Sequence, residues 1–246
     1  MKAIVLAGGK GKRLAPYTKI LPKPLMPIGD MPILEVILRQ MKMAGIDNVV
    51  LTVGHLSGLM RTFFQDGQQL GMQISYSYEE TPLGTAGPIA FVEGLDESFL
   101  VTNGDVLTTL HFDDLLRFHN EHQAAATIAT HRREVRIDLG VIEWDGKPSI
   151  KGYIEKPTYD YSVSMGVYVF APRVIKYIPR GEYLDFPDLV RKLINAGEKV
   201  VGYPFEGYWK DLGSPDDYEQ AVLDFEKMNS EFLPKESTNE LENPSI

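Results

Sequence analysis

The sequence predicts an α/β fold in which a mostly parallel central sheet is flanked by helices. Short apolar runs alternate with segments of helical period through the first half of the chain, a pattern typical of βαβ units. Closely spaced runs of strand character follow between residues 127 and 170. We therefore expect a Rossmann-like sheet that carries a β-rich insertion in the second half of the chain.

The elements of the first half support this prediction in order. Apolar residues at positions 33, 34, 37, 38 and 41 have helical spacing, which predicts one amphipathic helix. The expected strands are Ala3–Ala7, Asn48–Val53, Gln73–Tyr78 and Phe99–Thr102, and the expected helices are Pro32–Met43, Leu56–Gln65 and a segment that begins within Thr85–Glu93. This order is β-α-β-α-β-α-β, for which right-handed crossovers are expected.

The second half of the chain predicts first a group of closely spaced strands and then further helices. After a helix at Asp113–His122, the expected strands are Thr127–His131, Leu139–Glu143, Ser149–Ile154 and Val163–Phe170. We expect this β-rich insertion to close over the C-terminal edge of the sheet. The last expected elements are helix Phe186–Asn195, strand Lys199–Tyr203 and helix Pro215–Lys227. We assign residues 1–230 to a single domain and expect the polar tail 231–246 to be disordered.

Composition restricts the classes of partner. The 246 residues include 43% apolar residues and no cysteine, which excludes disulfides and a cysteine nucleophile and fits a cytoplasmic protein. The net charge of −9 argues against nucleic acid as a partner. Each apolar run is shorter than the roughly 18–20 residues of a membrane span, so no membrane association is expected. Assembly into a homo-oligomer is compatible with the sequence, which does not set the oligomeric state.

Basic residues nevertheless gather at the start of the chain. Six of them lie between Met1 and Lys23, and no acidic residue precedes Asp30. A basic run of this kind is often only a solvated face. Here it interleaves with glycines directly after the first strand, which favours a site for a small polyphosphate.

The glycine-rich segment 8–11 allows three interpretations. A dinucleotide-binding fingerprint needs a third glycine where Leu14 stands, and a Walker A loop needs Ser or Thr where Arg13 stands. Both interpretations therefore fail. The third is a loop whose backbone N–H groups face a triphosphate, while Arg13 and Lys23 supply positive charge to the transferred phosphoryl group.

Two aspartates follow strand-like runs far apart in the chain. Asp105 ends the run that begins at Phe99, and Asp211 ends the run that begins at Gly207. Carboxylates at strand ends can hold Mg²⁺ over a phosphate, although each aspartate could instead cap a following helix. In combination with the glycine-rich loop, they predict a phosphoryl-transfer site.

Together these residues resemble a known family. The pattern Gly8-Gly-x-Gly-x-Arg-Leu14, followed by Pro22-Lys-Pro-Leu25, is similar to the signature of the sugar-1-phosphate nucleotidylyltransferases, and the motifs are closest to those of mannose-1-phosphate guanylyltransferases. Further matches follow in family order at Pro82–Gly87, Asn103–Asp105, Leu139–Glu143, Glu155–Pro157, Ser164–Phe170 and Trp209–Pro215.

The resemblance implies roles for individual residues. The catalytic residues would be Arg13, Lys23, Asp105 and Asp211, with Mg²⁺ as the cofactor held by Asp105 and Asp211. Nucleotide contacts are expected from Leu6, Ala7, Gly8, Gly9, Gly11, Lys12, Arg13, Glu79, Glu80, Pro82, Gly84, Thr85, Gly87 and Gly104. Contacts to the sugar phosphate are expected from Gly140, Glu155, Lys156, Ser164 and Gly166. The implied partners are a nucleoside triphosphate and a sugar-1-phosphate.

The identity of base and sugar is less constrained. Several uridylyl- and thymidylyltransferases of the family carry glutamine where this chain has Glu79 and Glu80, and a carboxylate can accept two hydrogen bonds from guanine. This favours GTP, with mannose-1-phosphate or a manno-configured heptose-1-phosphate as the sugar. The alternatives are a thymidylyl-, uridylyl- or cytidylyltransferase acting on glucose-1-phosphate, and a non-catalytic regulatory subunit that binds nucleotide sugars.

Overall fold

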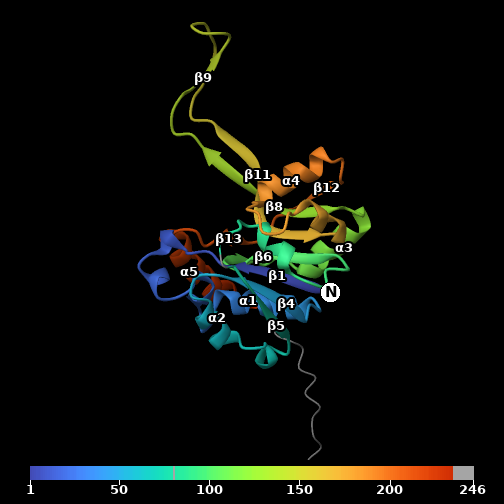
Figure 1. The fold of residues 1–246 in the computed structure, drawn as a ribbon. Coiled ribbons are helices and arrows are strands. Elements are labelled where there is room, and N and C mark those ends of the chain that lie inside the picture. Colours follow the sequence, from blue (N-terminus) through green and yellow to red (C-terminus); the bar gives the residue numbers. More distant parts are fainter. Residues whose placement is uncertain (80, 235–246) are drawn as a thin grey trace, which may run out of the picture.

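A computed structural model describes residues 1–79 and 81–234 and contains a seven-stranded sheet (Figure 1). The strand order is β12-β8-β11-β6-β1-β4-β5. Neighbouring strands from β6 to β5 are parallel, as are β12 and β8, whereas β11 is antiparallel to both of its neighbours. The predicted mostly parallel sheet is therefore confirmed.

The elements have the following bounds. The sheet contains β12 (Val200–Phe205), β8 (Ala126–Arg136), β11 (Thr158–Phe170), β6 (Phe99–Asn103), β1 (Lys2–Ala7), β4 (Asn48–Val53) and β5 (Gln73–Tyr78). The α-helices are α1 (Ile33–Met43), α2 (Ser57–Phe64), α3 (Phe112–His122), α4 (Phe186–Asn195) and α5 (Pro215–Phe232). Three small antiparallel pairs are β2 (Pro27–Ile28) with β3 (Met31–Pro32), β9 (Val141–Trp144) with β10 (Ile150–Ile154), and β7 (Val106–Thr108) with β13 (Trp209–Asp211). Short 3₁₀ helices are η1 (Lys12–Leu14), η2 (Tyr17–Lys19), η3 (Lys23–Leu25), η4 (Gln68–Leu70), η5 (Gly87–Phe91) and η6 (Pro172–Tyr177).

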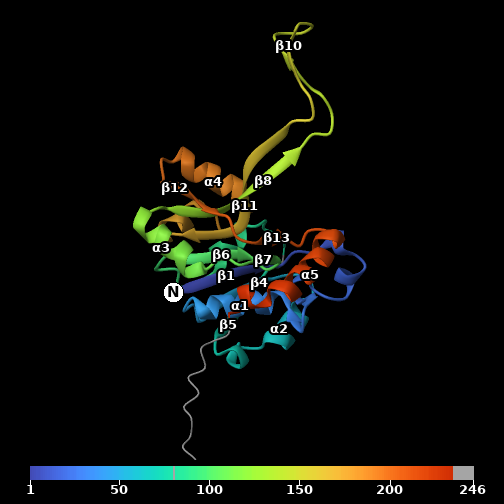
Figure 2. The same ribbon diagram turned by 180° about the vertical axis from the view of Figure 1, so that it is seen from behind.

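Both faces of the central sheet are covered. Along β1, Ala3 and Val5 belong to one hydrophobic core and Ile4 to the other, because successive strand residues point to opposite faces. Apolar residues of α1, α2 and α5 complete the first core, and those of α4 complete the second. Figures 1 and 2 show α1, α2 and α5 on one side of β1 and α4 on the other. Strands buried on both faces explain the continuous apolar runs of the sequence.

The β-rich insertion differs from its prediction. We expected it to close over the sheet edge, but β8 and β11 continue as a two-stranded ribbon that carries β9 and β10 away from the body (Figures 1 and 2). Cross-strand pairing persists out to Thr158 and Arg136. The Arg132 guanidinium also donates to both carboxylate oxygens of Asp160 across the ribbon, at 3.1 and 2.8 Å. These long-range pairings make both strands longer than the sequence predicted.

Two further boundaries are corrected. The helix expected within Thr85–Glu93 is only the 3₁₀ helix η5, because the backbone N–H groups of Ala86 and Gly87 donate to the carbonyl of Leu184 and tie the chain to another segment. Helix α5 ends at Phe232, which is buried, so the expected tail boundary at 231 was too early. Glu80 and residues 235–246 lie outside the described residues. Among the residues described, no helix is long and apolar enough to cross a membrane.

Stability should depend on pH through His119. This side chain is buried on α3, and its Nδ1 lies 2.8 Å from the Thr127 hydroxyl. Burial lowers the pKa of His119 from 6.5 to about 4. Between pH 7 and pH 5 the unfolded chain therefore binds a proton that the folded chain does not. The free energy of unfolding consequently decreases as the pH is lowered. The stability contributed by neutral His119 is fully present above the unfolded pKa of 6.5. It is lost as the pH falls toward the folded pKa of about 4.

We expect His119→Gln to weaken this pH dependence. Urea unfolding at pH 7 and pH 5 should show that the wild type loses about 2 kcal/mol more stability between these pH values than the variant. Equal losses in both proteins would contradict the assignment of the pH dependence to His119.

Candidate active site

A cleft of about 520 Å³ lies at the carboxyl ends of β1, β4 and β6. Leu6 and Ala7 end β1, Thr52 lies near the end of β4, and Asn103 ends β6; all four line the cleft. The carboxyl end of a parallel sheet is the usual position of a ligand in open α/β folds. Among the predicted site residues, the cleft is lined by Leu6, Ala7, Gly8, Gly9, Gly11, Lys12, Arg13, Lys23, Glu79, Pro82, Gly84, Thr85 and Asp105.

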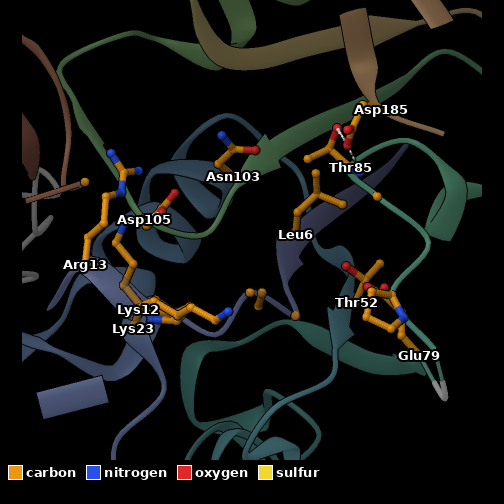
Figure 3. A pocket seen from close by; sticks show the side chains of 18 of the residues that line it. Leu6, Lys12, Arg13, Lys23, Thr52, Glu79, Thr85, Asn103, Asp105 and Asp185 are labelled. Atoms are coloured by element: carbon orange, nitrogen blue, oxygen red, sulfur yellow. Dashed lines mark hydrogen bonds and ion pairs between the residues drawn. The ribbon is translucent and has the colours of Figure 1, made fainter. Parts of the chain in front are cut away.

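The cleft has two chemically different ends, which Figure 3 shows. Arg13, Lys12 and Lys23 gather with Asp105 at one end. Thr85, Asp185, Thr52 and Glu79 lie toward the other end. A basic end and a polar end with hydrogen-bonding side chains match the two parts of a nucleotide, the phosphates and the base.

The glycine-rich loop leads from β1 into the basic end. Gly11 has a φ of +56°, and a Cβ there would lie 2.8 Å from Thr18 Cγ2. The Thr18 hydroxyl donates to the Gly11 carbonyl at 2.8 Å. This left-handed conformation, which glycine adopts without steric cost, turns the chain so that Lys12 and Arg13 follow directly in η1.

The two predicted metal-binding aspartates lie together because β7 pairs with β13. Asp105 immediately precedes β7, and Asp211 pairs with Val106. The Leu212 N–H donates to the Asp105 carbonyl at 3.2 Å. Asp105 and Asp211 are more than a hundred positions apart in the sequence, and the backbone pairing of the two segments holds them close together.

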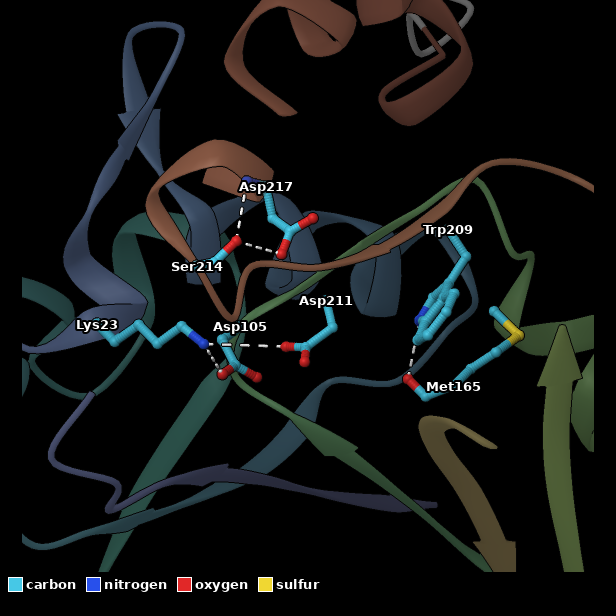
Figure 4. Close-up of polar contacts among 7 residues, drawn as sticks. All are labelled: Lys23, Asp105, Met165, Trp209, Asp211, Ser214 and Asp217. Atoms are coloured by element: carbon cyan, nitrogen blue, oxygen red, sulfur yellow. Dashed lines mark hydrogen bonds and ion pairs between the residues drawn. The ribbon is translucent and has the colours of Figure 1, made fainter. Parts of the chain in front are cut away.

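Both carboxylates surround the Lys23 ammonium (Figure 4). Lys23 Nζ donates to Asp105 Oδ2 and lies 3.9 Å from Asp211 Oδ1. Burial raises the pKa of Asp211, and the charge of Asp105 adds to this, while Lys23 and Arg13 oppose it. Two oxygen-bearing side chains that converge on one cation fit the needs of a hard divalent ion, which takes its remaining ligands from phosphates and water.

Arg13 approaches the same cluster over Gly213. A Cβ at Gly213 would lie 3.1 Å from both terminal nitrogens of the Arg13 guanidinium and 3.0 Å from Asp211 Oδ2. Glycine therefore leaves room for the guanidinium beside the carboxylate pair. Three of the four predicted catalytic residues, Arg13, Lys23 and Asp105, line this end of the cleft. Asp211 is not part of the lining and adjoins it through Lys23, at 3.9 Å.

Glu79 forms part of the opposite end. Its Oε2 accepts from the Leu83 N–H at 3.3 Å, and its Oε1 lies 2.8 Å from the position that a Cβ on Gly8 would occupy. Burial raises the pKa of Glu79. Gly8 thus permits the close approach of the Glu79 carboxylate, and both residues line the cleft.

The turn Pro82–Gly87 is held against the segment that leads into α4. Gly84 has a φ of +79°, and a Cβ there would lie 2.6 Å from the Leu184 carbonyl oxygen. Gly87 is buried behind the turn and does not line the cleft. Gly104 also lies outside the lining, where its N–H donates to the Leu6 carbonyl at 2.9 Å. Both glycines therefore shape the cleft through the backbone.

The predicted sugar-side residues fall into two groups. Gly166 (φ +75°) adjoins the cleft, because a Cβ there would lie 2.5 Å from Nδ2 of the cleft residue Asn103. The Gly166 N–H donates to Ser164 Oγ at 3.3 Å, and Trp209 Nε1 donates to the Met165 carbonyl at 2.9 Å (Figure 4). The strand segment 164–166 is therefore fixed beside the basic end.

The structure does not bring the second group to the cleft. Gly140 precedes β9, and Glu155 and Lys156 follow β10 on the projecting insertion. None of them lines the cleft, and Glu155 and Lys156 are exposed. A Cβ on Gly140 would lie 1.9 Å from the Tyr153 hydroxyl oxygen, so this glycine is required by its own hairpin in the present arrangement.

Several cleft residues escaped the sequence analysis. Thr52, Asn103, Tyr183 and Asp185 all line the cleft. Asn103 directly precedes the Gly-Asp pair and could have been found from that position. Tyr183 and Asp185 carried no such signal, because an aspartate before an amphipathic helix is ordinarily taken as an N-cap.

Comparison with known proteins identifies the family. A family profile described as nucleotidyl transferase matches residues 2–228. The chain belongs to this family. This membership confirms the resemblance to sugar-1-phosphate nucleotidylyltransferases that the motifs indicated.

Curated relatives carry different substrate names. The chain is 36% identical over 232 residues to a mannose-1-phosphate guanylyltransferase of Mycobacterium tuberculosis, with coverage of 90% of this chain and 64% of the relative. It is 35% identical over 242 residues to a UTP--glucose-1-phosphate uridylyltransferase of Synechocystis, with coverage of 90% and 62%. The chain thus spans less than two thirds of the length of both relatives.

Solved structures confirm the fold. A Bacillus anthracis protein described provisionally as a glucose-1-phosphate thymidylyltransferase superposes with a TM-score of 0.74 at 24% identity, with coverage of 91% of this chain and 94% of that chain. A structure of HddC from Yersinia pseudotuberculosis, complexed with GMP-PN, gives a TM-score of 0.69 at 20% identity, covering 91% and 99%.

We expect Gly84→Ala to destabilise the fold more than Gly146→Ala. Both glycines have a φ of +79°, so the backbone strain on substitution is matched, but a Cβ at Gly146 meets no atom within 4 Å. Urea unfolding should show an additional loss of about 1–3 kcal/mol for Gly84→Ala, the usual cost of overpacking. Equal losses would show that the turn and the Leu184 backbone are not packed rigidly.

Proposed function

We propose that this chain transfers a nucleotidyl group from a nucleoside triphosphate to a sugar-1-phosphate, which yields a nucleotide sugar and pyrophosphate. The observation that carries the proposal is the cluster of Arg13, Lys23, Asp105 and Asp211 at the basic end of a cleft that starts from a glycine-rich loop. A regulatory subunit without activity would not need to retain all four charged groups.

The reaction needs no protein nucleophile. A phosphate oxygen of the sugar-1-phosphate forms a bond to the α-phosphorus, and the bond from that phosphorus to the oxygen shared with the β-phosphate breaks. Pyrophosphate leaves with the electron pair, so no proton transfer is required. Catalysis of such an in-line displacement rests on positioning and on stabilising charge at the phosphoryl oxygens.

The basic side chains supply that stabilisation. The Lys23 ammonium, held by Asp105, faces the region where the attacking phosphate and the α-phosphate would meet. Arg13, held over Gly213, would neutralise the leaving pyrophosphate. Fixed cations at the position of developing charge avoid the cost of reorganising solvent.

Asp105 and Asp211 would hold a magnesium ion. The two carboxylates already converge on one ammonium, and oxygen donors of this kind suit Mg²⁺. When bound, the ion would reduce repulsion between the two polyanionic substrates. Lys23 would then shift its partner from carboxylate to phosphate.

The acidic side chain at the polar end of the cleft favours GTP as the nucleotide substrate. The Glu79 carboxylate lies beside Gly8 in the cleft, and guanine presents two adjacent N–H groups that can donate hydrogen bonds to a carboxylate. Uracil or thymine would present its O4 to the same carboxylate, so that two acceptors would face each other. We therefore propose GTP, with mannose-1-phosphate or a manno-configured heptose-1-phosphate; the uridylyltransferase among the relatives keeps UTP with glucose-1-phosphate as the alternative.

A pyrophosphate-release assay over a matrix of triphosphates and sugar-1-phosphates tests the proposed reaction. We expect one pair to dominate, and Arg13→Ala and Asp105→Asn each to lower turnover by at least about 10², the usual effect of removing one preorganised electrostatic group. The matched controls Arg191→Ala and Asp114→Asn, which lie in exposed ion pairs outside the cleft, should retain normal turnover.

Chelation gives a further check on the metal. Excess EDTA should abolish pyrophosphate release, and added Mg²⁺ should restore it. Normal turnover in both Arg13→Ala and Asp105→Asn would rule out the proposed mechanism. Pyrophosphate release that persists in EDTA would rule out a magnesium ion in that mechanism.

We expect Glu79→Gln to change base preference. A glutamine keeps one acceptor and adds a donor amide that can reach a pyrimidine O4, so the ratio of kcat/KM for GTP over UTP should fall by about tenfold. Glu182→Gln is the matched control, because Glu182 is exposed next to the same turn and does not line the cleft. An unchanged ratio of kcat/KM for GTP over UTP in Glu79→Gln would mean that Glu79 does not discriminate between the bases.

A further inference from the structure

The turn Pro82–Gly87 forms several hydrogen bonds with the segment that precedes α4. The Leu184 carbonyl accepts from the N–H groups of Ala86 and Gly87, at 2.9 and 3.0 Å, and the Leu184 N–H donates to the Leu83 carbonyl at 2.9 Å. The two segments are about a hundred residues apart in the sequence. The shape of this end of the cleft therefore depends on a contact between distant loops.

Asp185 adds the side-chain part of this contact. Its Oδ1 accepts from the Thr85 N–H at 2.9 Å and from the Thr85 hydroxyl at 3.1 Å. The Thr85 Oγ1 in turn accepts from the Phe186 N–H at 2.9 Å. Thr85 is thus bound on its backbone and its side chain by residues 185 and 186, as Figure 3 shows for Asp185.

The position of Asp185 makes this arrangement unusual. Asp185 occupies the N-cap position of α4, yet its side chain accepts no hydrogen bond from the first turn of that helix. An N-cap aspartate ordinarily stabilises its own helix by about 1 kcal/mol. Asp185 forgoes this contribution and turns toward the cleft, which it lines together with Thr85.

Tyr183 keeps the carboxylate in this orientation. The Tyr183 hydroxyl donates to Asp185 Oδ2 at 2.6 Å, so each oxygen of Asp185 has a partner of its own. This hydrogen bond, followed by those from Thr85, holds the pKa of Asp185 below its usual value. The group is therefore a fixed anion at neutral pH, and charge-assisted hydrogen bonds of this kind are about twice as strong as neutral ones.

We propose that Asp185 is a positioning residue for nucleoside triphosphate binding, acting through Thr85 to hold the turn Pro82–Gly87 in the conformation that receives the nucleotide. The inference rests on the proposed function, because it takes this end of the cleft to be the nucleotide end. It deepens that function by assigning a role to a residue from the distant α4 segment. Asp185 is placed away from the Lys23 cluster, so its effect should concern the triphosphate and not the sugar phosphate.

Kinetics of three variants test this role. We expect Asp185→Ala to raise KM for GTP by about tenfold and to leave kcat and KM for the sugar-1-phosphate within about threefold of the wild type. Asp185→Asn should recover much of the loss, because its amide oxygen can still accept from Thr85. Thr85→Val, which removes the shared hydroxyl, should resemble Asp185→Ala.

Asp188→Ala is the matched control. Asp188 lies in the first turn of the same helix and is exposed in an ion pair with Arg191 at 3.1 Å. It does not line the cleft, so its loss should leave all kinetic constants unchanged. If Asp185→Ala does not fold, Asp185→Asn and Thr85→Val still decide the question.

Calorimetric measurement of GTP binding distinguishes a failure of the positioning role from a failure of the proposed function. If the wild type releases no pyrophosphate with any substrate pair, the proposed function fails, and weaker GTP binding by Asp185→Ala than by Asp188→Ala would still support the positioning role. If the wild type is active but KM for GTP and Kd for GTP are unchanged in Asp185→Ala, the positioning role fails alone. A uniform loss of kcat and of affinity for both substrates, parallel to a lower melting temperature, would also overturn it, because that is the signature of a purely structural residue.

Discussion

The reactive end of the cleft depends on the pairing of β7 with β13. This small antiparallel contact places Asp105 and Asp211 around one ammonium group. Two carboxylates this close repel each other unless a cation lies between them, and the raised pKa of Asp211 reflects both its burial and the charge of Asp105. Lys23 offsets this repulsion in the free protein. The cluster therefore combines two carboxylates and one ammonium group in direct contact.

The elements around this pairing fix its geometry. Directly after β13, Gly213 leaves room for Arg13, and Ser214 caps α5 by accepting from the Asp217 N–H at 3.2 Å. The same helix packs Phe225 and Phe232 into the main core. The position of Asp211 is therefore anchored on one side by a strand pair and on the other by a helix that packs into the core, and such rigid elements hold charged groups in a fixed orientation.

The polar end of the cleft is assembled from both halves of the chain. Glu79 and the turn Pro82–Gly87 belong to the first half, whereas Tyr183 and Asp185 belong to the second. The insertion between them extends away from the body, so only its root at Ser164–Gly166 adjoins the cleft, through Asn103. The pairings of β11 with β6 and of β13 with β7 bring the second-half residues of the cleft next to those of the first half.

The sequence by itself determined the features that depend on local rules. Apolar periodicity predicted the parallel strands and the main helices. The glycine-rich loop and the two aspartates marked residues that gather near the basic end of the cleft, because left-handed turns and strand-end carboxylates have recognisable local patterns. Only the tertiary structure decided the length and direction of the β8–β11 ribbon, the exclusion of Glu155 and Lys156 from the cleft, and the contact of Asp185 with Thr85. Strand length depends on a cross-strand partner, and an aspartate before a helix has the same sequence pattern whether it caps that helix or reaches a loop a hundred residues away.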